Sequence, residues 1–225
     1  MIQIKRSRCP PKLEKSKSKK AYRLRSVVKA LWRMQHGKCC YCEAKIPEQG
    51  HGQTVEHYYP KRTFCNKKNT WENLLLACGG CNGRKGSEFP QDESGEPLII
   101  DPSKPGEDPE SHLHFNVDLA DVELWGLIAP KGKSRKGDTT INVIGLNEPP
   151  KPGLRRRRIR DLISILLCIS DAREHGDIAL LSNWNDHMRS YLSAKTDYSA
   201  VGRAFARRHN LDAAVGLDIP CGAEE

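Results

Sequence analysis

Apolar residues near the N-terminus recur at the spacing of a helix. Five of them fall on one stripe at intervals of three and four, which predicts an amphipathic helix over residues 21–35. They are Leu24, Val27, Val28, Leu31 and Trp32. Gly37 follows where such a helix is expected to end. The preceding residues 5–20 are basic and have no apolar period, so we expect a flexible or extended segment there, either an arm along a phosphate backbone or a solvated tail.

The middle of the chain has shorter apolar runs of the strand type. Thr54 to His57 is one such run, and Pro60 stops it soon afterwards. Residues 71–76 predict a second strand, and residues 78–85 predict a short helix that follows it directly. Two strands followed by a helix make a ββα unit. Because successive strand side chains point to opposite faces, Glu56 and His57 share a site only if the first strand ends or kinks there.

The last third of the chain returns to helical spacing. Apolar stripes over residues 159–169, 181–192 and 201–205 predict three helices after a Pro- and Gly-rich turn at residues 149–153. Between the ββα unit and these helices, alternation from residue 113 to 119 and a second apolar run at 122–128 predict a hairpin.

These elements define the expected fold class and domains. We expect an α+β protein with a zinc-stabilised ββα core, an N-terminal helix and a mainly helical C-terminal region. The expected divisions are a basic arm and helix at 1–36, the core at 37–90, a loop and hairpin extension at 91–150, and a partner-binding helical region at 151–225.

Composition favours a basic protein with a phosphate-containing partner. The chain has 225 residues, 37% hydrophobic and 29% charged, and its formal net charge is +9. A positive excess favours nucleic acid, although basic proteins without that function are common. The N-terminus has no apolar signal-peptide core, and the apolar stretch near Leu162–Ile169 is too short to span a bilayer. We therefore expect a cytoplasmic protein without a membrane partner.

The cysteines favour a structural zinc ion. Nine are present, and four form two Cys-x-x-Cys pairs: Cys39, Cys42, Cys78 and Cys81. In a reducing compartment such pairs favour a metal over disulfides, and four thiolates complete the tetrahedral shell of Zn²⁺. A redox site or an iron–sulfur cluster is a weaker alternative. Cys40 and Cys65 lie close enough in sequence to replace a ligand.

Between and after the cysteine pairs lie polar residues of the types that an active site for phosphodiester hydrolysis needs. His57 is suited to act as the base near neutral pH. Glu56 and Asn82 offer oxygen atoms to a hard divalent cation. Asn73 could orient His57 through a hydrogen bond, and Lys85 or its neighbour Arg84 could pair with a phosphate oxygen. Each alone is more typical of a surface pair, a turn or a helix start, but together, between two Cys-x-x-Cys pairs, they favour the catalytic interpretation.

This arrangement resembles the HNH (ββα-metal) nuclease family. The resemblance rests on Glu56-His57-Tyr58-Tyr59-Pro60, on Asn73-Leu74, and on Cys78-Gly79-Gly80-Cys81-Asn82-Gly83-Arg84-Lys85. Glu56 stands where the family commonly has Asp, and Asn82 where it commonly has His. Both departures keep an oxygen donor, so they favour Mg²⁺ or Mn²⁺ as the catalytic metal.

The resemblance extends to the PtuB family, the HNH component of Septu-type and some retron anti-phage systems. It covers roughly residues 1–170 and includes five further segments: 2–6, 37–43, 55–61, 98–102 and 140–147. It implies a bacterial nuclease of DNA, or of RNA, in a hetero-oligomer with a PtuA-like ATPase. In retron systems it implies a reverse transcriptase with its RNA and DNA as further partners. The alternative is a non-catalytic, zinc-stabilised nucleic-acid-binding or adaptor protein, which would not need His57, Asn73 and Asn82 together.

A run of arginines, Arg155–Arg158, precedes the first C-terminal stripe. It could contact a phosphate backbone, or it could be a solvated face of the helix.

Overall fold

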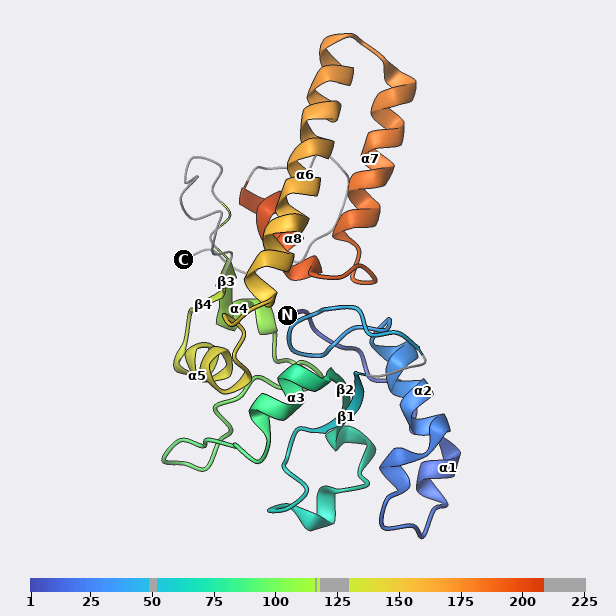
Figure 1. Cartoon of the computed structure of the whole chain (residues 1–225), viewed down its shortest axis with the longest axis vertical. Helices are drawn as coiled ribbons and strands as arrows, with labels where there is room; N and C mark the ends of the chain where they lie inside the picture. The colour runs from blue at the N-terminus through green and yellow to red at the C-terminus, as the bar shows by residue number, and fades with distance from the viewer. Residues whose placement is uncertain (49–51, 116, 118–129, 209–225) are drawn as a thin grey trace. The chain divides into compact units, whose positions relative to one another are not determined.

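The computed structural model describes residues 1–48, 52–115, 117 and 130–208, in two compact units (Figure 1). The first unit comprises residues 1–113 and 132–146. The second comprises the described residues of 114–131 and 147–225. The four cysteines of the two pairs and the candidate residues Glu56, His57, Asn73, Asn82 and Lys85 lie in the first unit.

The first unit contains the expected ββα element. Strand β1 (Gln53–His57) pairs antiparallel with β2 (Leu74–Cys78), with Glu56 opposite Leu75 and His57 opposite Leu74. Helix α3 (Gly79–Lys85) begins at the end of β2. Strand β1 ends at His57, as a site shared by Glu56 and His57 would require, and the sharing of one site stays a prediction.

The N-terminal segment is folded against the core. The expected helix forms as α2 (Arg25–Met34), preceded by the short turns α1 (Pro11–Glu14) and η1 (Ala21–Arg23). The helix starts later than expected because Leu24, at φ −56° and ψ 133°, is extended. Leu13 is buried and Arg6 is hydrogen-bonded to Trp71, so residues 5–20 are not flexible, as one alternative expected. Outside α1 they form no helix or strand, as the extended alternative allowed.

Apolar side chains from α2 and β2 form the core of the first unit. Val27 and Leu31 are fully buried on α2, and residues 74–77 of β2 are fully buried on both faces. A strand covered on both sides is expected to be uniformly apolar, as the run Leu-Leu-Leu-Ala is. This packing fixes the end of β2, from which Cys78 leads into α3.

The remaining elements of the first unit follow the ββα core. The turns η2 (Cys65–Lys67) and η3 (Trp71–Asn73) lie in the connection between the strands. Helix α4 (Pro109–His112) and helix α5 (Arg135–Ile144) come later, and Ser134 caps α5 by accepting a hydrogen bond from Gly137 N. Helix α5 is not among the elements predicted from the sequence.

A second pair of short strands lies where the chain passes between the units. Strand β3 (Leu113–Phe115) pairs with β4 (Pro130–Gly132). The strand expected at residues 122–128 falls outside the described residues.

The second unit is helical. It contains α6 (Lys151–Glu174), α7 (Ile178–Leu192) and α8 (Ser199–Arg208), and α6 and α7 run side by side as an antiparallel hairpin (Figure 1). The arginine run before the first apolar stripe is not uniformly solvated: Arg155 lies over the Phe115 ring and Arg158 over the Tyr191 ring. Within the described residues, no helix combines the length and apolarity needed to cross a bilayer.

Candidate functional site

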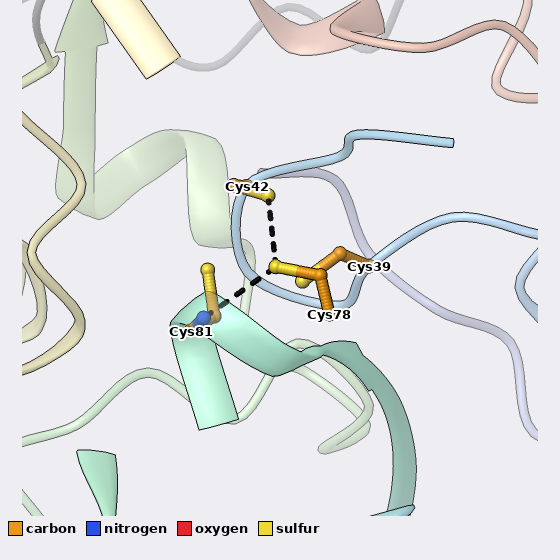
Figure 2. Close-up of side chains that lie close together, drawn as sticks. All are labelled: Cys39, Cys42, Cys78 and Cys81. Carbon is orange, nitrogen blue, oxygen red and sulfur yellow. Dashed lines mark hydrogen bonds between the residues drawn. The ribbon is translucent and has the colours of Figure 1, made fainter. Parts of the chain in front are cut away.

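Four cysteines from two segments converge on one point (Figure 2). The ligand atoms of Cys39, Cys42, Cys78 and Cys81 all lie within 4.8 Å of one another. The Cys42 and Cys78 sulfurs are 3.9 Å apart. Four thiolates around Zn²⁺ at about 2.3 Å would be separated by about 3.8 Å, so the spacing suits a tetrahedral ion.

Local backbone geometry presents these thiols. Glu43 adopts a left-handed conformation, φ 63°, and its N–H donates to the Cys39 carbonyl at 3.1 Å. This turn brings Cys39 and Cys42 to one side of the chain. Cys78 caps α3, its sulfur accepting a hydrogen bond from Cys81 N at 3.4 Å.

The electrostatics of the four thiols favour a cation between them. The pKa of Cys39 is raised by burial, and those of Cys42 and Cys81 are raised by the neighbouring thiols, while hydrogen bonds from the same neighbours lower the pKa of Cys78. A metal ion is therefore needed for all four groups to be thiolates. The donor set fits structural zinc. Cys40 is buried but outside the cluster and Cys65 is exposed, so neither replaces a ligand.

Helix α3 packs over one face of β1. Asn82 Nδ2 donates to Thr54 Oγ1 at 2.8 Å, and Lys85 Nζ lies 2.7 Å from Glu56 Oε1. Residues 54 and 56 share a strand face and residues 82 and 85 share a helix face, so these two contacts set the register of strand and helix. Glu56 and Asn82 are thus brought to the same interface.

Glu56 is held by three groups of the protein. Its side chain is 2% exposed, and Oε1 accepts hydrogen bonds from Tyr41 Oη, at 3.2 Å, and from Lys85. Burial raises the pKa of this carboxyl, while the charge of Lys85 and hydrogen bonds from Lys85, Tyr41 and the His57 backbone lower it. Both side-chain partners contact Oε1 rather than Oε2.

His57 is a buried imidazole with a defined tautomer. Its Nε2 lies 2.9 Å from the Lys68 carbonyl oxygen, which only accepts hydrogen bonds. Nε2 therefore carries the hydrogen, and Nδ1 keeps its lone pair. Burial lowers the pKa of His57 to about 4; the Lys68 carbonyl opposes this, and lysines including Lys61 and Lys85 add to it. The ring also packs edge-on against Tyr22, 4.7 Å between centroids.

Asn73 holds the connection between the strands. Its Oδ1 accepts from Tyr59 N at 2.7 Å, and its Nδ2 donates to the Tyr59 and Lys67 carbonyls, both at 3.0 Å. The direct bond to His57 that the sequence suggested is not among its contacts in the described residues. Asn73 instead closes the loop from Tyr59 to Lys67, which leads to the Lys68 carbonyl that orients His57.

Lys85 has an internal position. Its side chain is fully buried, and its Nζ contacts Glu56 and also donates to the His57 carbonyl at 2.9 Å. A contact from this side chain to a phosphate, as the sequence suggested, would require it to leave both partners. Its neighbour Arg84 is exposed.

Arg6 is a site-supporting residue that the sequence reasoning did not single out. Its guanidinium donates to the carbonyls of Trp71, Glu72 and Leu74 at 2.6 to 3.0 Å and to Ser103 Oγ. These carbonyls flank Asn73. No local pattern distinguishes Arg6 from the other cations of residues 5–20, because its partners are remote in sequence.

The oxygen atoms near β1 and α3 form a plausible donor set for a second, hard metal. Asn82 uses Nδ2, not Oδ1, for its bonds to Thr54 and Val55, and both side-chain partners of Glu56 contact Oε1 rather than Oε2. Amide and carboxylate oxygens suit Mg²⁺ or Mn²⁺. The residues present therefore fit such an ion.

Comparison with known proteins agrees with this geometry. Residues 39–88 match the family described as HNH endonuclease. The segment runs from Cys39 to just beyond Lys85, so it contains all the candidate zinc ligands and catalytic residues predicted from the sequence.

Three relatives are similar over a larger part of the chain. "Septu protein PtuB" of Bacillus thuringiensis is 34% identical over 66% of this chain and 55% of its own length. "Retron Vc95 putative HNH endonuclease" of Vibrio cholerae is 33% identical over 59% of this chain and 63% of its own. "Septu protein PtuA" of Bacillus mycoides is 27% identical over 60% of this chain and 21% of its own. The chain thus spans little more than half the length of the PtuB relative.

Proposed function

Because this chain belongs to the HNH endonuclease family through residues 39–88, we propose that it hydrolyses phosphodiester bonds of nucleic acid, with DNA favoured over RNA. The observation that carries the proposal is the protonation and orientation of the His57 imidazole ring. Its bond to the Lys68 carbonyl places the ring hydrogen on Nε2, and burial lowers the pKa of the ring, so Nδ1 is unprotonated at neutral pH. An unprotonated, oriented imidazole nitrogen is what a general base requires.

In this proposal each polar residue has a separate task. His57 Nδ1 takes a proton from the attacking water, while the Lys68 carbonyl holds the opposite ring nitrogen. Asn73 is a positioning residue, since it acts through the loop that presents that carbonyl. Lys85 is likewise a positioning residue, because it joins the Glu56 carboxylate to the His57 carbonyl.

A divalent ion, Mg²⁺ or Mn²⁺, would be held by Glu56 and Asn82. When bound, it would stabilise negative charge on the phosphate and on the leaving oxygen. Zn²⁺ in the four-cysteine cluster would be structural, because four protein thiolates leave no open coordination position.

A cleavage assay tests the proposal. The zinc-loaded chain is incubated with plasmid DNA and with total RNA in Mg²⁺ or Mn²⁺. His57→Ala should lower the rate by at least about 10²-fold, the usual minimum for losing a general base. His175→Ala is the matched control, because His175 is 70% exposed and belongs to the second unit, and it should cut as the wild type does.

The result has two informative alternatives. Equal cutting by His57→Ala and wild type would contradict the assignment of His57. Binding of nucleic acid without cutting by any preparation would favour the non-catalytic adaptor. Zinc content should be the same in wild type and His57→Ala, which separates loss of catalysis from loss of fold.

We also propose an anti-phage defence role with a PtuA-like ATPase partner, bound through the helical C-terminal region, and in a retron setting with a reverse transcriptase and its RNA and DNA. The support is similarity to proteins named for Septu and retron systems, including one named PtuA. The hairpin of α6 and α7 exposes apolar side chains, with Leu167 65% and Ile178 81% exposed. Preparing the assay protein with the co-expressed ATPase tests this role: the ATPase should co-purify, and its loss in washing would contradict it.

A further inference from the structure

Three cations gather around the aromatic ring that packs against His57, and a fourth lies over a second ring. Arg23 at the end of η1, and Lys61 and Lys68 from the connection between the strands, lie 5.7, 5.3 and 5.9 Å from the Tyr22 ring centroid. Lys67 lies 3.4 Å from the ring centroid of Tyr59. We call Arg23, Lys61, Lys67 and Lys68 the loop cations.

The fold brings the loop cations together from two remote segments. Asn69 Oδ1 accepts a hydrogen bond from Tyr22 N at 3.1 Å, and its Nδ2 donates to the Ser18 carbonyl at 3.2 Å. Asn69 therefore fastens the segment before α2 to the loop that carries the lysines. Since the Tyr22 ring in turn packs against His57, the cations are placed beside the candidate base by the fold itself.

Within the described part of the chain, no acidic side chain forms an ion pair with the loop cations. Among the described residues, every ion pair recorded in the first unit involves other cations, so none of the loop cations has a carboxylate within 4.0 Å. Their combined charge acts on the buried groups nearby. Burial alone would raise the pKa of Tyr22, but Lys61, Arg23 and Lys68 outweigh it and lower that pKa. Gathered like charges repel one another, so an anionic ligand would stabilise them.

We propose that Arg23, Lys61, Lys67 and Lys68 bind the phosphates that adjoin the one cut at His57. This inference rests on the proposed function and names how the substrate strand is held. Phosphates repeat about every 3.4 Å along the axis of one strand, so neighbours of the reacting phosphate lie within reach of long lysine side chains. Contacts of this kind are independent of base sequence and position the strand without reading it.

The test uses the salt dependence of binding by the full, zinc-loaded chain. Binding of a labelled DNA duplex and a labelled single strand is measured in the His57→Ala background, between about 50 and 200 mM KCl. The test variant replaces Lys61, Lys67 and Lys68 by Gln. The matched control replaces Lys12, Lys29 and Lys104, which are exposed lysines of the same unit, and changes the net charge equally.

Three lost phosphate contacts should reduce the slope of log affinity against log salt by about 2 to 3, at about 0.9 per contact on duplex and 0.7 on single strand. The control variant should change this slope by less than about 0.9, the value for one phosphate contact on duplex DNA. An equal change in both variants, or none in the test variant, would overturn the proposal. A smaller slope without any cleavage by wild type would support the phosphate contacts and contradict the nuclease. His57-dependent cleavage with an unchanged slope would support the nuclease and contradict the phosphate contacts.

Discussion

The two ends of the ββα unit are held in different ways. At the cysteine end, four thiols from a loop, a strand end and a helix start meet within 4.8 Å. At the His57 end, the strand end and its following loop are held by hydrogen bonds and one buried ion pair. One end thus has the donor set for a metal ion, and the other is held by contacts that the chain supplies itself.

This difference predicts two kinds of sensitivity. Loss of a single ligand at the cysteine end should remove the shared ion and affect both cysteine segments together. At the His57 end each contact is separate, so the loss of stability should follow the burial and charge of the group removed. Substitutions at the two ends therefore provide a direct comparison of metal-dependent and metal-independent stabilisation.

Cys78→Ser should have the largest effect. Structural zinc contributes roughly 10 kcal/mol or more in small sites, which matches or exceeds the whole stability of a typical domain of about 5 to 15 kcal/mol. We expect the first unit to lose zinc and its cooperative unfolding transition, as seen by metal analysis and circular dichroism. Cys65→Ser is the control, because Cys65 is exposed and outside the cluster. Full zinc content and an unchanged melting curve for Cys78→Ser would show that this end is not metal-dependent.

Lys85→Met should have the next largest effect. It leaves the Glu56 carboxylate buried without its cation, which costs about 3 to 5 kcal/mol for a buried pair. Denaturant unfolding of the zinc-loaded chain measures the loss. Lys29→Met is the matched control, because the Lys29–Glu48 pair is about half exposed, and its change should stay within about 0.5 kcal/mol.

A double substitution sharpens the Lys85 result. Adding Glu56→Gln to Lys85→Met removes the unpaired charge, so the double variant should be more stable than Lys85→Met alone. Contacting residues usually show a coupling of about 0.5 to 3 kcal/mol. Strictly additive losses would mean that the two side chains do not stabilise one another, whatever their 2.7 Å separation.

Local patterns were sufficient to predict the metal end and the order of the core elements. The two Cys-x-x-Cys pairs identify both the ligand type of a metal site and the spacing of its ligands in the sequence. The cluster contains the four expected cysteines. The strand, strand and helix order also follows from short-range apolar patterns and from Pro60. By contrast, α5 was missed, because its start depends on a single Ser134 cap within a basic, Gly-containing stretch that is also typical of a loop.

The arrangement around His57 was less accessible to sequence reasoning. The candidate residue types were evident, but their partners were not, because each partner is remote in the chain or is a backbone atom. The Lys68 group that contacts His57 is a backbone carbonyl, which no side-chain pattern reveals. Tyr41 belongs to the cysteine turn, 15 residues before Glu56 in the sequence. Arg6 lies in a basic segment whose composition predicts disorder, although burial of Ile4 and Leu13 fixes that segment against the core. Composition describes average behaviour, and two apolar anchors were enough to override it.

Arg6→Ala should have a smaller but measurable effect, which tests whether the His57 end is held by separate contacts. The substitution leaves the carbonyls of Trp71, Glu72 and Leu74 without their shared donor. Hydrogen bonds from a charged group contribute about 1.5 to 3 kcal/mol, so we expect a loss of about 2 kcal/mol in denaturant unfolding with zinc retained. Arg8→Ala, an exposed neighbour, should change stability by less than about 0.5 kcal/mol. Hydrogen exchange should also become faster at the amides of residues 67–74, because Asn73 then loses its fixed position. Faster exchange confined to residues 39–45 would instead mean that Arg6 stabilises the zinc end, and the distinction between the two ends would fail.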